Sequence, residues 1–336
     1  MKRKLIPIIF IFVIFFFILN EMFVFFKKRE VNLEFTVKKG ETVESVIERL
    51  REKGAFSRSL FTDIFVRVKD VKFKAGKYKV AGKYSDRDII DVLEEGQLRF
   101  VKVTIPEGYN LFDIAELLDE KKICNEKEFL NLTLNETFTK SLGVNSKTLE
   151  GFLFPDTYYF ADSDNCESVV KTMYGNFKKR VIPLFKSYTP PELVKKALGN
   201  VTVEKIVAVA SIVEKESGLK EERPKIAGVI YRRLIKKMPL QCDPTVIYGY
   251  RLKGKKIEDL KGSDIRKSQS LYNTYLYKDL PPTPICNPGL DSIVAAMFPE
   301  KSSYLYFFAV NGRHVFSKSY KEHLRKLKKY YNRRVK

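Results

Sequence analysis

Val201–Glu216 reads VTVEKIVAVASIVEKE, and this stretch decides the fold because it must lie inside a core. It is apolar on nearly every face over about three turns, and a helix that is apolar all round belongs in a protein interior. Glu216 follows Ile212 by four residues and Val209 by seven, so its side chain projects from the same apolar stripe. Because burial disfavours a charged carboxylate, we expect a raised pKa for Glu216, as a general acid requires. The alternative at this point is a frayed helix end with solvated glutamates.

The composition indicates room for two domains and a sizeable core. The chain has 336 residues, of which 44% are apolar and 26 are Phe. Its four cysteines lie far apart without CxxC spacing, which argues against a zinc site or a disulfide-dense scaffold and leaves one or two disulfides open. Because only two histidines are present, we expect no metal site, and we expect no cofactor.

An apolar run near the N-terminus predicts a membrane anchor. Leu5–Leu19 is uninterrupted and Met22–Phe26 extends it, so about 22 residues are available to cross a bilayer core. Basic residues at 2–4 favour a cytoplasmic N-terminus, although basic residues also follow at 27–29. A cleaved signal peptide is the rival, but no small-x-small cleavage motif follows the run. We expect a single-pass anchor in the cytoplasmic (inner) membrane, with the chain after residue 30 outside the cytoplasm.

The net charge of +21 suggests an anionic partner, and nucleic acid is the first class to consider. The expected topology argues against nucleic acid, because the basic domain would lie on the other side of the membrane. The densest basic run, residues 318–336, predicts a solvated amphipathic helix or a membrane-surface patch. We therefore expect membrane lipid as a partner at the N-terminal anchor, and no nucleic acid.

An internal repeat follows the anchor. Phe35–Gly40 (FTVKKG) is echoed by Val103–Gly108 (VTIPEG), and each predicts a short strand, a glycine turn and then a helix. Thr42 and Asn110 stand at equivalent positions as helix N-caps. The repeat resembles LysM modules, small domains that hold glycan chains of N-acetyl sugars, and a purely structural pair of lobes is the alternative.

The remaining elements are predicted from spacing and turn residues. They are a strand at Phe73–Val80, a helix at Asp86–Leu93 opened by Ser85, helices over Leu193–Ala197, Glu222–Leu234 and Leu290–Met297, a loop over Leu240–Gly249 marked by Pro244 and Gly249, and a buried strand at Tyr304–Val310 joined through Asn311-Gly312 to His314–Phe316, with Tyr304, Tyr306 and Phe307 in the core.

Several catalytic classes lack their motifs, since the sequence has no GxSxG elbow, no P-loop and no GxGxxG. Ser217–Lys220 matches the SxxK of penicillin-recognising enzymes, but the KTG element that those enzymes need is absent. Amides and tyrosines accompany the glutamates instead, and they can bind the hydroxyls, N-acetyl groups and rings of a sugar chain. Standard glycosidases use two carboxylates. A lytic transglycosylase can use one, which protonates the glycosidic oxygen and then takes the proton of the sugar's own C6 hydroxyl.

Long motifs in a fixed order carry a specific resemblance over nearly the whole chain. They are EGFLFPDTYY (150–159), VASIVEKES (209–217), ERPKIAGVIYRRL (222–234), LQCDPTVIYG (240–249), YNTY (272–275), LPPTPICNPG (280–289) and AAMFPEKSSYLYFFAV (295–310). With these motifs the chain resembles the endolytic murein transglycosylase family (MltG, YceG-like). Cys242 and Cys286 depart from the residue types expected in those motif loops.

The resemblance implies roles for particular residues. It makes Glu216, the second glutamate of the EKE triplet, the catalytic acid, and Glu214, about 200° away around the helix, a structural partner of Arg223 or Arg232. We expect further sugar-contacting or supporting groups, although the two aspartates among them, each beside a proline, could instead cap turns. These groups are Asp156, Glu222, Gln241, Asp243, Asn273 and Tyr275.

The expected architecture is an α+β fold with an N-terminal transmembrane helix, LysM-like α/β lobes and a mixed α+β catalytic domain. The expected ranges are 1–30 for the tail and anchor, 31–140 for the LysM-like region and 141–336 for the catalytic domain. The resemblance implies cleavage of the bond between N-acetylmuramic acid and N-acetylglucosamine in nascent peptidoglycan strands, beside the cell-wall synthesis complex. Hydrolytic cleavage by a muramidase and a non-catalytic wall-binding scaffold are the alternatives.

Overall fold

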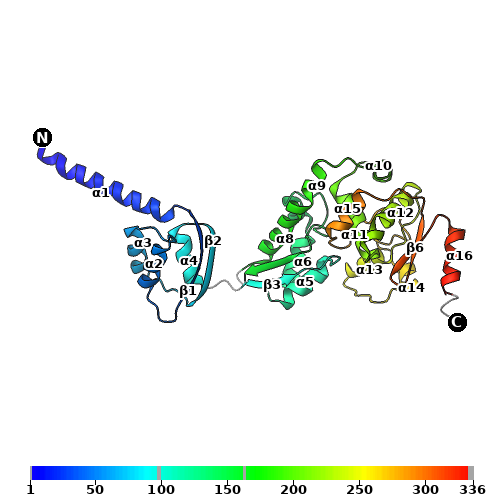
Figure 1. Cartoon of the computed structure of the whole chain (residues 1–336), viewed down its shortest axis with the longest axis horizontal. Coiled ribbons are helices and arrows are strands. Elements are labelled where there is room, and N and C mark those ends of the chain that lie inside the picture. Colours follow the sequence, from blue (N-terminus) through cyan, green and yellow to red (C-terminus); the bar gives the residue numbers. More distant parts are fainter. Residues whose placement is uncertain (1, 97–99, 162–163, 332–336) are drawn as a thin grey trace. The chain divides into compact units, whose positions relative to one another are not determined.

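The first unit of this computed structural model, Met1–Phe100, is built on a two-stranded antiparallel sheet (Figure 1). The structure describes residues 2–96, 100–161 and 164–331. In the sheet Leu33 lies opposite Val80 and Phe35 opposite Tyr78, whose rings stack at 5.4 Å. The elements of the unit are α1 (Lys2–Phe26), β1 (Arg29–Val37), α2 (Val43–Glu52), α3 (Leu60–Val68), β2 (Gly76–Tyr84) and α4 (Asp86–Glu95).

The helix predicted at Asp86–Leu93 is confirmed as α4, and Ser85 opens it with a capping box. The strand predicted at Phe73–Val80 is shifted along the chain, because β2 begins at Gly76 and ends at Tyr84. Its expected first residues lie against α4 instead, where the Lys74 amide donates to the Leu93 carbonyl at 2.9 Å.

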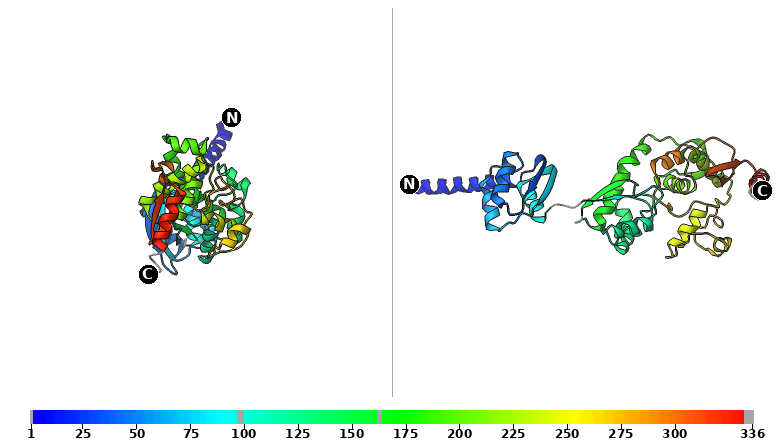
Figure 2. Two further views of the ribbon diagram at one scale, coloured as in Figure 1. Left: turned by 90° about the vertical axis from the view of Figure 1, so that its right-hand side faces the viewer. Right: turned by 60° about the horizontal axis from the view of Figure 1, so that its bottom comes forward.

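α1 extends away from the β1–β2 sheet (Figures 1 and 2), and Phe25 near its end is fully buried against Phe61 and Phe65. Within the described part of the chain, no helix has the length and apolar character needed to cross a membrane. Much of the predicted anchor falls on residues 2–11, whose side chains lie outside the described set. The anchor at Leu5–Leu19 therefore stays a prediction.

The second unit, Val101–Lys336, is mostly helical with two small sheets, β3–β4 and β5–β6. The mixed α+β character expected from the sequence is present. Its elements, with β3 beginning at the boundary, are β3 (Phe100–Thr104), α5 (Leu111–Glu120), α6 (Glu126–Thr133), α7 (Glu136–Ser141), β4 (Thr157–Ala161), α8 (Cys166–Arg180), α9 (Ile182–Lys186), α10 (Glu192–Leu198), α11 (Val203–Glu216), the 3-10 turn η1 (Lys220–Glu222), α12 (Arg223–Ile235), α13 (Asp243–Arg251), α14 (Gly262–Lys267), α15 (Leu290–Met297), β5 (Tyr306–Val310), β6 (Arg313–Ser317) and α16 (Tyr320–Tyr331).

The internal repeat is present in both units. Gly40 and Gly108 both turn the chain in the left-handed region, at φ of 83° and 81°, which an L side chain rarely adopts. Thr42 caps α2 and Asn110 caps α5 through side-chain oxygens, as predicted. The two copies are therefore equivalent in local structure.

The chain divides at residue 100, whereas the sequence analysis placed a boundary at 140. The second copy of the repeat shares a core with the helices that follow it: Leu111 and Ile114 of α5 belong to the same buried cluster as Ile206 of α11. Because apolar faces need a partner to bury against, this copy packs with the larger unit.

The prediction of a loop over Leu240–Gly249 is wrong from its fourth residue onward, because α13 begins at Asp243. Pro244 occupies the first turn of that helix, where no backbone N–H is required. Helix Leu290–Met297 is confirmed as α15, and the hairpin is confirmed with Asn311 and Gly312 at φ of 48° and 76°.

Strand β5 is half-buried instead of fully buried. Tyr304 and Tyr306, expected in the core, are also half-buried, while Phe307 packs against the edge of the core. The hairpin lies beside the basic helix α16 near the C-terminal end of its unit (Figure 2), and most residues of its two strands are half-buried.

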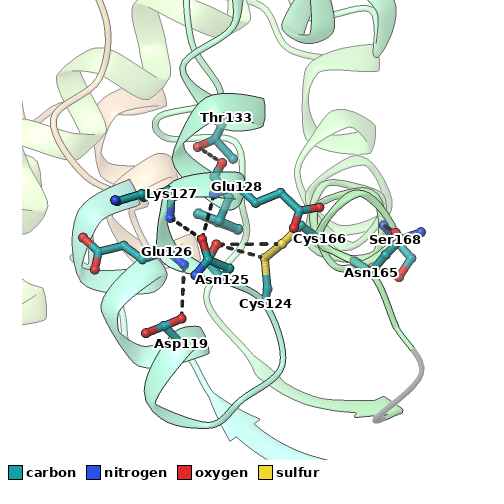
Figure 3. Close-up of a disulfide and its surroundings, with 11 residues drawn as sticks. Asp119, Cys124, Asn125, Glu126, Lys127, Glu128, Thr133, Asn165, Cys166 and Ser168 are labelled. Atoms are coloured by element: carbon teal, nitrogen blue, oxygen red, sulfur yellow. Dashed lines mark hydrogen bonds between the residues drawn. A yellow bond between two sulfur atoms is a disulfide. The ribbon is translucent and has the colours of Figure 1, made fainter.

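A disulfide joins Cys124 to Cys166, 42 residues apart (Figure 3). Cys166 is the first residue of α8, and Cys124 precedes Asn125, the N-cap of α6, so the bond ties the starts of two helices together. Cys242 and Cys286 are free and buried.

We predict that Cys124→Ser combined with Cys166→Ser lowers the free energy of unfolding by about 2–4 kcal/mol, because the unfolded chain gains the freedom of an open loop. Denaturant titration measures this change. As a control for the pairing, alkylation of the denatured, unreduced protein should label two thiols by mass spectrometry; labelling of four would contradict the disulfide.

Candidate active site at the end of helix α11

Helix α11 is held inside the core of the second unit along most of its length. The Thr202 side chain accepts the Lys205 amide at 3.4 Å and starts the helix, and residues 206–213 are all buried. Figure 1 shows α12, α13 and α15 around it. The helix ends at Glu216, so the carboxyl groups of Glu214 and Glu216 lie at the end of the buried part of the helix.

The Glu216 carboxyl is largely removed from water, and this burial raises its pKa to about 7. The neighbouring Asp243 carboxylate adds to the rise, while a hydrogen bond from the Cys242 thiol and the positive charge of Arg233 oppose it. The raised pKa expected from the sequence is therefore present. Such a group keeps its proton near neutrality and can give it up to a leaving oxygen.

The turn that enters α13 lies beside Glu216 and is fixed by the 272–275 segment. The Gln241 amide donates to the Thr274 carbonyl at 3.1 Å, and the Cys242 amide donates to the Thr274 hydroxyl at 3.0 Å. The Tyr275 hydroxyl donates to Asp243 at 2.5 Å. Gln241 has a φ of 55°, in the left-handed region that residues other than glycine rarely adopt. The hydrogen bonds to the 272–275 segment stabilise this conformation at the start of α13.

Glu214, two residues earlier, is in a different environment. Its carboxylate pairs with Arg223 at 3.0 Å, accepts the Gly289 amide at 3.0 Å, and its side chain is 6% exposed. The prediction that Glu214 is a structural partner of Arg223 is confirmed. The alternative partner, Arg232, instead bonds Tyr304, Glu300 and Ser302.

Of the predicted site residues, the structure brings Glu216, Gln241, Asp243 and Tyr275 together. The other three take part in hydrogen-bond networks of their own. Asn273 donates to the carbonyls of Ile265 and Ser268, both at 2.8 Å, Glu222 bonds His314 at 2.7 Å, and Asp156 bonds Asn176 and Arg180 on α8 at 2.9 and 2.8 Å. Their contacts hold loops and strands in place, and a sugar-binding role for them stays a prediction.

Sequence reasoning missed Arg233, which lies on α12 and reaches the turn before α13. Its Nη1 donates to the carbonyl of Leu240 at 2.7 Å and approaches the Gln241 side-chain oxygen at 3.4 Å. The residue is 8% exposed, and its charge acts on Glu216. The double arginine at 232–233 was the available signal, but helix periodicity does not show which arginine points inward.

Sequence reasoning also missed Glu150, a fully buried carboxyl group. It accepts the Leu111 amide at 3.0 Å and the Asn287 side-chain amide at 3.1 Å, and burial raises its pKa to about 8. Two residues before Asn287, the Ile285 amide donates to Ser211 of α11 at 3.1 Å. The Glu150–Asn287 contact therefore helps to position α11.

Two further features concern ligand binding. A cavity of about 430 Å³ lies near the start of α11, far along the helix from Glu216, and its lining includes Glu204, Lys205 and Pro281. Across the described ranges, no group of three or more His, Cys, Asp or Glu residues is arranged to hold a metal ion.

Comparisons with known proteins agree with one another. The sequence profile of the YceG-like family matches residues 35–329. The chain is 34% identical over 326 residues to a Bacillus subtilis (strain 168) protein named endolytic murein transglycosylase, covering 90% of this chain and 86% of that protein. A protein of the same name from Streptococcus pneumoniae (strain D39) is 29% identical, and this chain spans 58% of its length. A crystal structure of a YceG-like protein from Listeria monocytogenes matches with a TM-score of 0.58 at 29% identity, covering 89% of this chain and 100% of that chain.

We predict that Glu216→Gln stabilises the folded protein increasingly as the pH rises. In wild type the folded pKa of about 7 exceeds the ordinary value of 4.5, so the unfolded chain releases its proton first and stability falls as the pH rises between those values. Glutamine carries no such proton. The difference in unfolding free energy should grow by on the order of 1–3 kcal/mol in favour of the variant.

Denaturant titrations at a series of pH values measure this difference. Glu221→Gln, a change at an exposed glutamate near the same helix end, is the matched control and should follow wild type at every pH. A constant offset between Glu216→Gln and wild type across this range would contradict the assigned burial.

Proposed function

This chain belongs to the YceG-like family, and on that premise we propose that it is a lytic transglycosylase of peptidoglycan. The proposed substrate bond is the β-1,4 linkage between N-acetylmuramic acid and N-acetylglucosamine within nascent glycan strands. The observation that carries the proposal is the carboxyl of Glu216, with a pKa of about 7, near the polar side chains of Gln241, Asp243 and Tyr275. Amides and hydroxyls of this kind suit the N-acetyl and hydroxyl groups of a glycan.

In the proposed reaction the Glu216 carboxyl acts twice, first as an acid and then as a base. Glu216 gives its proton to the glycosidic oxygen, and the bond between that oxygen and C1 of the muramic acid breaks. The resulting Glu216 carboxylate then takes the proton of the C6 hydroxyl of the same sugar as O6 bonds to C1. The products are a free 4-hydroxyl on one strand and a 1,6-anhydro end on the other, and Glu216 is again protonated.

The presence of Asp243 makes hydrolysis, the reaction of a muramidase, the competing hypothesis. Glycosidases that add water use a second carboxylate as base or nucleophile, and Asp243 is the second carboxylate near Glu216. In the structure this carboxylate is engaged by the Tyr275 hydroxyl, which supports a positioning role over activation of water. The products decide between the two reactions, because only the transglycosylase leaves an anhydro end.

We predict that Glu216→Gln abolishes release of anhydro-muropeptides from purified peptidoglycan, with a loss of at least about 10³-fold, because the amide has no proton to transfer. Mass spectrometry of the products measures the loss. Glu221→Gln should retain wild-type activity.

Three outcomes would contradict the proposed residue or the proposed function. Anhydro ends made by folded Glu216→Gln would remove Glu216 from the reaction, and reducing ends from wild type would identify a muramidase. Binding of peptidoglycan by both proteins without any cleavage would identify a non-catalytic scaffold.

We also propose that the protein acts at the membrane, where the nascent glycan strands that are its proposed substrate are made. The strand–turn–helix repeat would help to hold the glycan as a LysM-like region, and cleavage beside the cell-wall synthesis complex would end strand elongation. The apolar run at Leu5–Leu19 and Met22–Phe26 would anchor the chain in the inner membrane. The Cys124–Cys166 disulfide supports a location outside the cytoplasm, since disulfides persist in oxidising compartments.

We predict that an alkaline phosphatase reporter fused after residue 336 is active in cells, because the C-terminus lies outside the cytoplasm. The same fusion with residues 5–26 deleted is the control and should be inactive. Activity of a cytoplasm-dependent fluorescent reporter at the same fusion point would contradict the proposed topology.

A further inference from the structure

Arg233 is a buried cation whose position is fixed by the protein. Its Nε donates to the Leu305 carbonyl at 2.7 Å, and its Nη1 donates to the carbonyls of Leu240 and Pro239 at 2.7 and 3.2 Å. The guanidinium also lies over the Tyr306 ring, 5.2 Å from its centroid. Contacts on two sides therefore hold the charge in one place before any substrate binds.

One nitrogen of this guanidinium, Nη2, makes no hydrogen bond to the described residues. Among the described residues, the hydrogen bonds of Arg233 go through Nε and Nη1, and none uses Nη2. Nη2 is also not among the buried polar atoms that lack a partner, so it keeps some contact with solvent. A largely buried arginine with one nitrogen that makes no hydrogen bond can stabilise a negative charge that forms near it.

The proposed reaction generates a negative charge on Glu216. Once Glu216 gives up its proton, its carboxylate is largely removed from water and lies near the Asp243 carboxylate, which is exposed to solvent. Burial and the like charge both disfavour the Glu216 carboxylate unless a cation is nearby. Arg233 bonds the Leu240 carbonyl and the Gln241 side chain in the turn that leads to Asp243, and from there its positive charge opposes the rise in the pKa of Glu216.

We propose that Arg233 is a positioning residue that stabilises the Glu216 carboxylate between its two proton transfers. This inference rests on the proposed function and adds a group that the sequence analysis did not include. Removal of the Arg233 charge destabilises the carboxylate form of Glu216 relative to its protonated form. Glu216 then holds its proton more tightly and releases it less readily to the glycosidic oxygen.

The other charged and titratable groups around Glu216 do not supply this charge. Asp243 and Tyr275 bond each other, and Cys242 contributes a neutral thiol whose pKa is raised by burial. On α11 itself, Glu214 is paired with Arg223, and the Lys215 ammonium donates to the Gly108 carbonyl at 3.3 Å.

The neighbouring Arg232 provides a matched control. It sits on the same helix, and all three of its nitrogens bond residues 300–304: Nε to the Tyr304 carbonyl at 2.8 Å, Nη1 to the Glu300 carbonyl at 3.4 Å and Nη2 to the Ser302 hydroxyl at 2.7 Å. Arg232→Gln therefore removes a comparable set of structural contacts without removing the charge beside Glu216.

The test is the pH dependence of kcat/KM for anhydro-product release by the full-length protein. Wild-type activity should decline above about pH 7 as Glu216 loses its proton. In Arg233→Gln we expect at least a roughly tenfold lower maximum and a decline displaced upward by roughly one pH unit. Arg233→Lys, which keeps the charge, and Arg232→Gln should both keep the wild-type midpoint.

The proposal is overturned if Arg233→Gln keeps the wild-type midpoint, or if Arg232→Gln displaces it equally. If Arg233→Gln is folded but inactive, carbon-13 NMR titration of the Glu216 carboxyl replaces the kinetic profile, and an unchanged midpoint overturns the proposal. That titration is independent of the proposed function. Absence of anhydro products from wild type would refute the function, while the titration would still decide whether Arg233 acts on Glu216.

Discussion

The burial of helix α11 is the constraint on which the rest of the second unit depends. Its apolar residues from Ile206 to Val213 must be covered on every side, and α12, α13 and α15 provide that cover. The same packing brings the end of the helix to the place where the turn before α13 and the 272–275 segment meet. The position of the Glu216 carboxyl is thus a consequence of core packing, and so is its removal from water.

Three glutamates show how the fold treats a carboxyl that it removes from water. Glu214 stays paired with Arg223, Glu150 accepts amide hydrogens in the core, and Glu216 is left with partners that only partly offset its burial. The first two arrangements hold elements together, although burial still raises the pKa of Glu150 to about 8. Glu216 differs from Glu150 in position, since it lies at the end of its helix and is only partly enclosed, and a raised pKa at such a place suits a group that must gain and lose a proton during a reaction.

Much of the fold was accessible from local pattern. The N-caps at Thr42 and Asn110 and helix α15 follow from short-range rules on turn chemistry and helix periodicity, and the structure agrees with them. The loop expected around Pro244 shows where such rules stop, because proline marks a loop and a first helical turn equally well. The boundary at residue 100 depends on which apolar faces meet, and a repeat read along the chain contains no information on that choice.

The sequence by itself determined that a buried helix ends in glutamates, that Glu216 continues an apolar stripe of that helix, and that Glu214 points to a different side of it. Periodicity suffices for this because it depends only on neighbours along one helix. Only the tertiary structure decided what surrounds the carboxyl: Arg233 from α12, Cys242 and Asp243 from the start of α13, and Tyr275 from a distant loop. The environment of a titratable group is set by residues far apart in the chain, so its chemistry emerges only when the core brings them together.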